Sequence, residues 1–398
     1  MKLGTKRNVL IGLLILVIVA AGAVFFALRT YGAHLENVPT ALEIMALVRM
    51  KYVDSISITD LARAYAKDGT IAGMLELLDD PYTRYMNKAD FTAFEESTEG
   101  SFAGIGVSVD IKDDYVVVVQ PYKNTPGYRA GLKPGDLIIA VDGKSTKSMA
   151  LDAAVSMIRG PAGTTVVLTI EREEDGQKKI SEVRITRAII HIPTVEYEVI
   201  KDSSSNGPGG SGPIGYLYIS QFTRGTSKEA AEALSEMKAE GIKGLLLDLR
   251  FNPGGLLDEV VALCAQFMNR QPVLYVVERD QKKQPVYASN YQPLGLPMVV
   301  LVNEWSASAS EIAAGALKDL KIATIMGKKT FGKGVVQTIY PLTSGGGMTL
   351  TTSRYLTAGG NSIHKIGIKP DIEVDLPEGS KEDVQYNAAL KLLRGKIK

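Results

Sequence analysis

The stretch from residue 302 to residue 317, V-N-E-W-S-A-S-A-S-E-I-A-A-G-A-L, carries three serines just ahead of an apolar run with helical spacing. The run before it, residues 298–302, is short and wholly apolar, which predicts a buried strand. Ser308 and Glu311 form the S-x-x-E pattern of a capping box, so Ser308 is expected at the helix N-cap. Backbone N–H groups at a helix N-terminus favour an oxyanion. A plain helix start and a nucleophile held at a strand-to-helix turn both fit this stretch.

The other two serines lie on either side of that turn. Ser306 falls on the strand side, and Ser310 falls inside the first turn of the helix. The capping pattern and a catalytic role therefore select the same residue, Ser308.

Outward from this turn, strand-like and helix-like segments alternate, which is typical of an α/β core. Strands are expected at 214–219, 245–249 and 298–302, and helices at 227–240, 257–268 and 308–317. Further strands at 335–340 and 348–355 and a terminal amphipathic helix at 381–394 complete the expected elements. The polar stretch D-S-S-S-N-G-P-G-G-S-G-P at 202–213 is expected to be a mobile loop.

A lysine follows the expected helix in T-F-G-K-G-V-V-Q, residues 330–337. Lys333 stands between two glycines, which leave its amine free to reach a buried position. A desolvated lysine loses basicity and can act as a general base near neutral pH, so a serine–lysine pair needs no histidine. An exposed loop lysine is the alternative.

A third stretch, L-D-L-R-F-N-P-G-G-L at 247–256, predicts a buried strand that runs through a glycine turn into a helix. Free N–H groups at such a turn could supply half of an oxyanion hole. An ordinary strand–helix turn fits the sequence equally well.

The segment 100–188 has a different sequence pattern, with short β-rich runs at 115–119, 137–141 and 165–170 and an expected helix at 150–158. The Asp142-Gly143 pair is a turn signal between two such runs. A compact, mostly β domain of about ninety residues fits this segment.

The composition is that of a globular protein of 398 residues, with 45% hydrophobic residues, 22% charged residues and a formal net charge of +1. That length predicts two or three domains, and the charge balance gives no reason to expect a nucleic-acid partner. The single cysteine, Cys264, excludes an internal disulfide and cysteine-rich metal sites, and its apolar surroundings predict a small buried side chain.

The N-terminus carries an uncharged run at 9–28, preceded by Lys2, Lys6 and Arg7. Its length suits a membrane-spanning helix, and the preceding charges predict a cytoplasmic N-terminus with the rest of the chain outside. The sequence Ala21-Gly22-Ala23 supports the alternative of a signal peptide that is cleaved to give a secreted protein.

Residues 31–99 predict a small helical segment, with helical spacing at 41–50 and 70–78. The sequence D-D-P-Y at 79–82 ends the second helix, since proline cannot continue it. We expect this segment to be a packing or dimerisation element rather than a catalytic one.

Taken in order, L-D-L-R-F-N-P-G-G, S-A-S-A-S-E-I-A-A-G-A-L and F-G-K-G-V-V-Q closely resemble the motifs of the carboxyl-terminal processing (tail-specific) protease family. These are serine peptidases with a Ser–Lys dyad, and the resemblance covers essentially everything after the anchor. It implies that Ser308 is the nucleophile, that Lys333 is its base and that Gln337 holds the lysine amine. It also implies an oxyanion hole from the backbone N–H groups of Ala309 and of Gly254 or Gly255.

The segment 100–188 likewise resembles a PDZ domain, because A-G-L-K-P-G-D-L-I at 130–138 matches a segment common in such domains. The loop Gly104-Ile105-Gly106-Val107 then resembles the one whose N–H groups bind a peptide's terminal carboxylate. Arg172 is a candidate relay from this domain to the active site, with an exposed strand-end arginine as the alternative.

The resemblance implies an α/β protease core of crotonase/Clp-like βα units with an inserted PDZ domain, helical segments at both ends and an N-terminal transmembrane helix. The expected division is an anchor at 1–30, a helical dimerisation-type segment at 31–99, a PDZ domain at 100–188, a peptidase core at 189–376 and a helix at 377–398. The implied protein is an extracytoplasmic endopeptidase that takes protein C-terminal tails and forms a homodimer through its N- and C-terminal helices. No cofactor or metal is implied.

Three alternatives stay open on the sequence. A Ser–His–Asp site would use His364 or His191 with Asp248, although a structural histidine is the better interpretation of each. A PDZ scaffold with an inactive core would be expected to have lost part of the dyad. A different hydrolase or acyl transferase on a similar core would not need a tail-binding domain.

Overall fold

The computed structural model of the chain describes residues 36–174, 176–201, 212–288, 292–375, 377, 379–380 and 382–397. The predicted membrane segment at 9–28, its signal-peptide alternative and most of the polar stretch at 202–213 lie outside the described residues. In the described part, no helix combines the length and the apolar character needed to cross a membrane.

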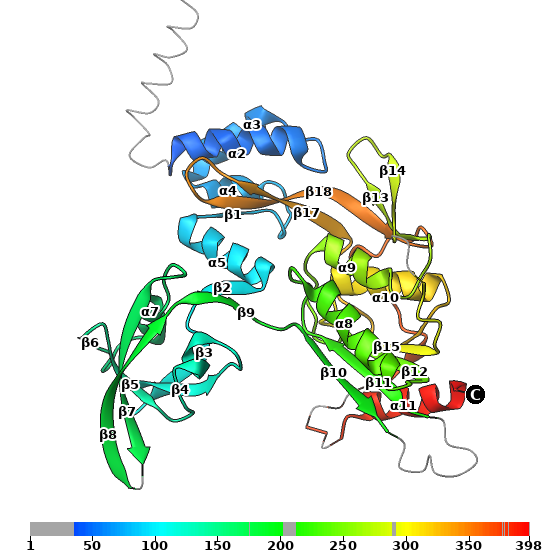
Figure 1. Cartoon of the computed structure of the whole chain (residues 1–398). Helices are drawn as coiled ribbons and strands as arrows, with labels where there is room; N and C mark the ends of the chain where they lie inside the picture. The colour runs from blue at the N-terminus through cyan, green and yellow to red at the C-terminus, as the bar shows by residue number, and fades with distance from the viewer. Residues whose placement is uncertain are drawn as a thin grey trace, which may run out of the picture.

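A six-stranded sheet forms the centre of the core, with the strand order β10-β11-β12-β15-β16-β19 (Figure 1). The strand β10 runs antiparallel to β11, and the remaining neighbours pair in parallel. Its strands are β10 (Val195–Ile200), β11 (Ile214–Ile219), β12 (Gly244–Asp248), β15 (Met298–Val302), β16 (Thr324–Gly327) and β19 (Ile372–Glu373). Every residue of β12 and β15 is buried, as expected when helices cover both faces of a parallel sheet.

Helices α8 (Thr226–Ala239), α9 (Leu257–Cys264) and α10 (Ala309–Asp319) pack on one face of this sheet, and α11 (Val384–Lys396) packs on the other. Successive residues of a strand point to opposite faces, so Leu247 joins the three-helix side while Leu246 packs with α11. Predicted helix 257–268 is too long, since α9 ends at Cys264.

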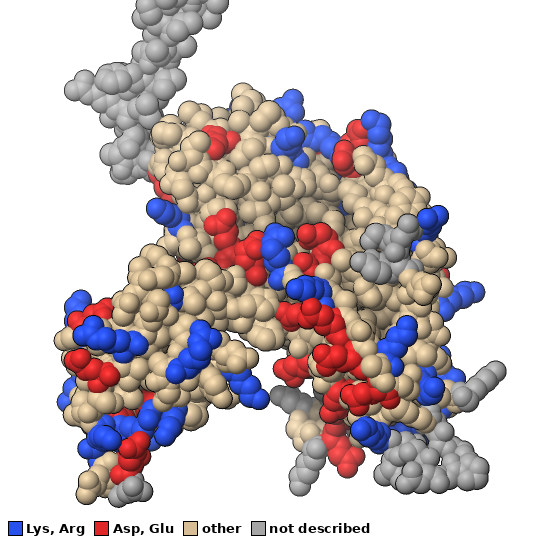
Figure 2. Space-filling model, viewed as in Figure 1, with Lys and Arg blue, Asp and Glu red and all other residues tan. Residues whose placement is uncertain are grey.

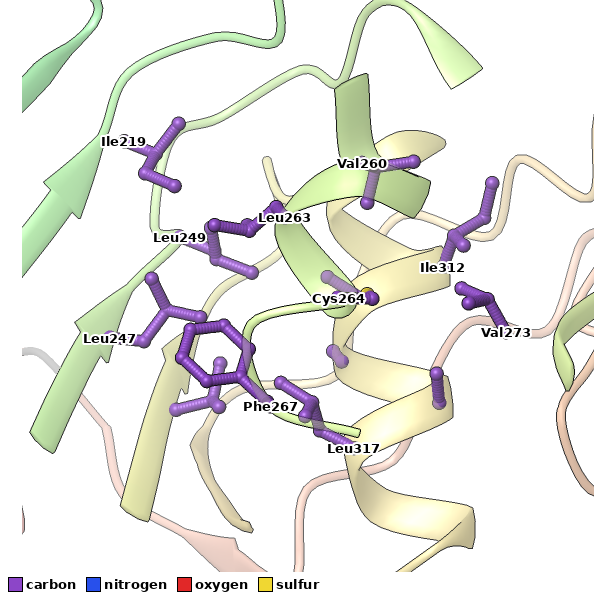
Figure 3. Close-up of a cluster of buried hydrophobic side chains, with 14 of the residues drawn as sticks. Ile219, Leu247, Leu249, Val260, Leu263, Cys264, Phe267, Val273, Ile312 and Leu317 are labelled. Carbon is purple, nitrogen blue, oxygen red and sulfur yellow. The ribbon is translucent and has the colours of Figure 1, made fainter. Parts of the chain in front are cut away.

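Cys264 lies inside the three-helix side of the core, beside Leu263 and Val260 (Figure 3). Burial raises the pKa of its thiol to about 12, so the thiolate is not formed near neutral pH. The prediction of a small buried side chain is confirmed.

A second sheet bridges the core and the N-terminal helices, with the order β1-β18-β13-β14 and with β17 also paired to β18 (Figure 1). Its strands are β1 (Arg84–Met86), β13 (Pro272–Val277), β14 (Lys283–Tyr287), β17 (Val335–Pro341) and β18 (Gly347–Thr357). The N-terminal helices are α2 (Val38–Lys51), α3 (Ile58–Asp68), α4 (Ile71–Glu76) and α5 (Lys88–Glu99). Leu342, Met348 and Leu350 share one buried cluster with α2–α4, so the helices are packed directly onto β18 and its hairpin.

The PDZ-like domain is an insertion whose entering and leaving strands pair with each other. β2 (Ser101–Gly104) runs antiparallel to β9 (Ala188–His191), and this two-stranded ribbon connects the domain to the rest of the molecule (Figure 1). Between them lie β3 (Val107–Lys112), β4 (Tyr115–Pro121), α6 (Pro126–Arg129), β5 (Leu137–Val141), β6 (Lys144–Ser145), α7 (Leu151–Ile158), β7 (Thr165–Glu174) and β8 (Gln177–Thr186). The predicted turn is confirmed, since Asp142 and Gly143 both have positive φ between β5 and β6.

The surface is hollowed between the PDZ-like domain and the core (Figure 2). Acidic side chains gather on the core side of this hollow, over β10 and α8, whereas acidic and basic side chains are mixed on the PDZ-like domain. The two lobes therefore face each other with different charge distributions.

A buried arginine fastens α11 to the end of β12. Arg250 donates to Asp248 at 2.6 Å, to Asp383 at 2.8 and 2.9 Å and to Gln385 at 3.1 Å. Burial alone would raise the pKa of Asp383, but hydrogen bonds from Arg250 and from backbone N–H groups lower it. The stability that the ionised Asp383 contributes is fully present at pH values above the ordinary pKa of an aspartate. It is lost as the pH falls through the lower pKa that Asp383 has in the folded protein.

We expect Arg250→Ala to destabilise the core by about 3–5 kcal/mol, because the buried Asp248 would lose its cationic partner. Urea unfolding measures the change. Arg63→Ala is the matched control, since its ion pair with Asp60 is exposed and is worth about 0–1 kcal/mol. Equal effects of the two substitutions would contradict the proposed role of Arg250.

Candidate active site

Ser308 stands at the N-cap of α10, directly after the loop that follows β15. The prediction of an N-cap at this serine is confirmed. Its backbone has φ 53° and ψ −112°, a conformation that side-chain-bearing residues rarely adopt and that is found preferentially at functional sites. Ser308 lines a cavity of about 470 Å³.

The neighbouring serines are buried and hold the structure together. The Ser306 hydroxyl donates to the carbonyl of Leu249 at 2.8 Å, and the Ser310 hydroxyl donates to the carbonyl of Asn252 at 3.0 Å. Both bonds tie the start of α10 to the loop after β12. Of the three serines, Ser308 alone lines the cavity.

Lys333 lines the same cavity from the loop before β17. Its amine lies 4.8 Å from the centre of the Tyr82 ring. Burial lowers the pKa of the lysine; Asp80 and Glu311 oppose this effect, and Arg84 adds to it. The outcome agrees with the expectation of a desolvated lysine of reduced basicity.

The carboxylate of Glu311 joins the serine and lysine loops. It accepts the backbone N–H of Ser308 at 2.9 Å, of Gly332 at 2.7 Å and of Lys333 at 2.8 Å, and the hydroxyl of Thr330 at 2.6 Å. The side chain is fully buried. From sequence, Glu311 was expected only to cap its own helix, and the capping-box spacing gave no sign of its contacts with the lysine loop.

Tyr355 provides a second connection between the two loops from β18. Its hydroxyl lies within hydrogen-bonding distance of the Lys333 carbonyl at 2.6 Å and of the Ser308 carbonyl at 3.2 Å. The ring is buried, and burial raises the pKa of the phenol well above its usual value, so it remains a donor.

Gln337 also lines the cavity, but its side-chain amide donates to the hydroxyl of Thr351 at 3.2 Å. No hydrogen bond joins it to the Lys333 amine among the described residues. Its predicted contact with the lysine amine stays a prediction.

The glycine turn after β12 lies against Ser308. A Cβ on Gly254 would come within 2.8 Å of the Ser308 Cβ and 2.9 Å of the Ala309 nitrogen, so only glycine fits there. The Gly254 N–H already donates to the Asn252 side chain at 2.8 Å. Within the described residues, the N–H groups of Gly255 and Ala309 have no acceptor, and both residues line the cavity. Of the two glycines, Gly255 is the better candidate oxyanion donor.

The residues of the alternative Ser–His–Asp site do not lie together in the structure. Asp248 bonds to Arg250, and His191 bonds to Glu229. In the described part of the chain, the Nδ1 atom of His364 is buried without a partner, and its ring is absent from the cavity wall. These contacts contradict a Ser308–His–Asp248 arrangement.

The segment expected only to pack or dimerise forms part of the cavity wall. Pro81, Tyr82 and Arg84 line the cavity, and Phe94 of α5 does so too. The segment that was expected to pack or dimerise therefore also lines the cavity, which the sequence did not predict. The sequence D-D-P-Y showed a helix end, but nothing in it showed which distant surface the tyrosine meets.

The loop Gly104-Ile105-Gly106-Val107 lines a small groove of about 70 Å³ together with α7 residues Val155 and Ile158. The N–H groups of Ile105 and Gly106 have no acceptor among the described residues, as a carboxylate-binding loop requires. The geometry of the predicted loop suits a terminal carboxylate.

A third cavity, of about 370 Å³, lies between this groove and the active-site cavity. It shares Phe102 and Arg159 with the groove, and Ser97 and Gln221 with the cavity around Ser308. The three hollows thus form a series that runs from the PDZ-like domain to the serine.

Arg172 takes no part in this series. It donates to Asp136 at 2.6 and 2.7 Å and to the carbonyl of Gly131 at 2.8 Å. It holds the 130–138 loop inside the PDZ-like domain and is not the exposed strand-end arginine of the alternative, while its role as a relay stays a prediction.

Comparison with known proteins agrees with this arrangement. Residues 213–374 match the family model described as peptidase family S41, residues 117–172 match a PDZ domain, and residues 27–90 match the N-terminal domain of the activating protease CtpB. A carboxy-terminal-processing protease of Bartonella bacilliformis is 37% identical over 374 residues, 83% of each chain. The chain belongs to peptidase family S41, the carboxy-terminal processing proteases.

Two further similar proteins support this assignment. The carboxy-terminal processing protease CtpA of Bacillus subtilis is 39% identical over 79% of this chain, and the match spans 65% of that relative. The solved photosystem II D1 C-terminal processing protease is 31% identical, with a TM-score of 0.56 over 89% of this chain and 96% of that one. The fold of the carboxyl-terminal processing proteases and the PDZ domain, both expected from the sequence, are thereby confirmed.

We expect Glu311→Gln to destabilise the protein by about 2–3 kcal/mol. The NH₂ group of the new amide would face N–H groups whose hydrogen bonds the carboxylate now accepts. Urea unfolding and the hydrolysis rate together measure the effect. Glu304→Gln, on the exposed part of the loop before α10, is the matched control and should change neither. A wild-type-like Glu311→Gln would show that the two loops hold their positions without this carboxylate.

Proposed function

We propose that this S41 protein is a serine endopeptidase that binds protein C-terminal tails in its PDZ domain and cleaves them with a Ser308–Lys333 dyad. The observation that carries the proposal is that Ser308 and Lys333 line one cavity, with both backbones bonded to the carboxylate of Glu311. The family membership supports proteolysis as the reaction class.

In the proposed reaction, the neutral amine of Lys333 takes the proton of the Ser308 hydroxyl as its oxygen attacks the scissile carbonyl. The N–H groups of Ala309 and Gly255 stabilise the oxyanion of the tetrahedral intermediate. Lys333 then protonates the leaving amine, the peptide C–N bond breaks, and the acyl-enzyme forms. Water, deprotonated by Lys333, attacks the ester; the ester C–O bond breaks, Lys333 returns the proton to Ser308, and the new carboxyl end is released.

The series of hollows supports the tail-binding part of the proposal. A peptide whose carboxylate sits on Ile105 and Gly106 could continue past Phe102 and Gln221 toward Ser308. The peptide would pair with the exposed edge of the PDZ sheet at β3. An extended protein tail therefore fits the series of three hollows better than a small ester does.

The proposal places the catalytic part outside the cytoplasm on an N-terminal anchor at 9–28. Its support is the uncharged run itself and the basic residues before it. The alternative of a cleaved signal peptide leads to the same compartment. Protease digestion of intact cells, followed by detection of each terminus, tests the orientation.

A homodimer through the N-terminal helices is also proposed. Leu42, Met50, Ile58 and Leu77 are large apolar side chains that α2–α4 and the residue after α4 leave exposed. Sedimentation velocity of the purified protein tests this assembly, and a monomer at all concentrations would contradict it.

A PDZ scaffold with an inactive core is the competing function. An acylating serine reagent that labels the wild-type protein but not Ser308→Ala would separate the two. Turnover of a peptide but not of a small ester would separate the protease from another hydrolase.

We expect Ser308→Ala and Lys333→Ala each to lower cleavage of a loosely folded protein by at least about a thousandfold. The full-length chain is incubated with the substrate, and products are followed by gel and mass spectrometry. Lys329→Ala removes an exposed lysine of the same loop, and this variant should cleave normally. Cleavage that survives in both dyad variants would overturn the proposed mechanism.

We expect a peptide with a free C-terminal carboxylate to bind full-length Ser308→Ala at least about tenfold more tightly than its amidated form. Fluorescence anisotropy measures the two affinities. The difference should disappear in a second variant with Gly106→Val, because a Cβ at Gly106 would lie 2.4 Å from that of Thr125.

Gly143→Val is the matched control for this experiment. Gly143 also has positive φ (77°) and lies in the same domain, but nothing lies within 4 Å of its would-be Cβ. The Gly143→Val variant should still bind the peptide with a free carboxylate more tightly than the amidated peptide. Equal binding of the two peptides to the unaltered loop would contradict tail recognition at this site.

A further inference from the structure

Tyr82 presents its ring face to the amine of Lys333 at 4.8 Å. A lysine cation at this distance is attracted by the negative face of an aromatic ring, and the attraction strengthens away from water. The neutral amine carries no net charge and gains little from the same contact. The ring therefore favours the charged form of this particular lysine.

The tyrosine backbone is fixed by bonds on both sides. The Tyr82 N–H donates to Asp80 at 3.0 Å, and its carbonyl accepts the hydroxyl of Thr349 at 2.9 Å. The adjacent Thr83 hydroxyl donates to Asp80 at 2.6 Å and accepts the Thr351 N–H at 3.0 Å. The turn after α4 is thus anchored to β18, and the ring is held at the cavity wall.

Opposing influences meet at the amine. Burial and the Arg84 guanidinium favour its neutral form, whereas the carboxylates of Asp80 and Glu311 favour the cation. Tyr82 itself stays a neutral phenol, because burial and the same two carboxylates raise its pKa. The Tyr82 ring thus acts with the two carboxylates to favour the charged form of the amine. It opposes the effect of burial, which favours loss of the proton.

We propose that Tyr82 is a positioning residue that holds Lys333 as a resting cation against its ring, and that the lysine must leave the ring and release one proton to solvent before it can accept the proton of Ser308. This inference rests on the proposed dyad. A substrate peptide that fills the cavity meets both side chains, since Tyr82 and Lys333 form parts of the same wall. Its entry can separate the amine from the ring.

Gln337 is connected to the same anchor. Its amide donates to the Thr351 hydroxyl, and the Thr351 N–H donates to Thr83 beside the ring. Gln337, which is predicted to hold the lysine amine, and the turn that carries Tyr82 are therefore both hydrogen-bonded to Thr351 of β18. A shift of β18 against the N-terminal turn would move Gln337 relative to Tyr82.

The test measures the Lys333 amine directly, by ¹³C NMR of the full-length Ser308→Ala protein labelled at lysine Cε. Lys333→Arg identifies the signal by its loss. Phenylalanine and 3,4,5-trifluorophenylalanine are then placed at position 82, because fluorination weakens the negative ring face with little change of shape. Circular dichroism checks that both variants keep the fold.

We expect Tyr82→Phe to leave the lysine pKa nearly unchanged and the fluorinated ring to lower it by about half to one and a half pH units. Tyr82→Leu should also lower it. In active protein, the acid limb of the kcat/KM profile should move to lower pH by the same amount, because the base loses its proton more readily.

An unchanged lysine pKa in the fluorinated variant would overturn the inference. So would an upward shift in Tyr82→Leu, which is the sign expected if the ring only excludes water from the amine. The NMR titration does not depend on turnover. A failure of the dyad itself would appear separately, as cleavage that survives in Lys333→Ala.

Discussion

The arrangement of the site depends on one buried carboxylate. Glu311 lies in the first turn of α10, yet three of its four hydrogen-bond donors belong to the loop before β17. A buried charge is costly unless it is fully bonded, and here the helix N-terminus and four donors compensate it. Because those donors include the backbone N–H groups of Ser308 and Lys333, the hydrogen bonds of a single carboxylate position both residues of the proposed dyad.

The parallel sheet explains why the remaining parts meet at the same place. The carboxyl ends of β12 and β15 lie side by side, so the glycine turn and the serine turn are neighbours in space. Ser306 and Ser310 then bond the two turns together through their hydroxyls. The three serines of the motif thus divide into two that build the site and one that remains available for chemistry.

The sequence predicted those features that depend on local pattern. The strand at 298–302, the N-cap at Ser308 and the turn at Asp142 follow from spacing within a few residues, and the structure has them. It could not predict that Gly255 rather than Gly254 keeps a free N–H, because a side chain two residues away decides this. Nor could it predict Tyr82 at the cavity wall, since that contact joins segments about 250 residues apart.

The site is consequently shared among three units that could otherwise be regarded as separate. The helices α2–α4 are packed onto the hairpin of β17 and β18, and their turn supplies Tyr82. The PDZ domain reaches the same cavity through a ribbon and the hollow that shares Ser97 and Gln221 with it. A lysine with lowered basicity is useful only while its surroundings stay dry and correctly placed. Since the N-terminal turn forms part of those surroundings, its docking on β18 helps to build the environment that the proposed dyad would need.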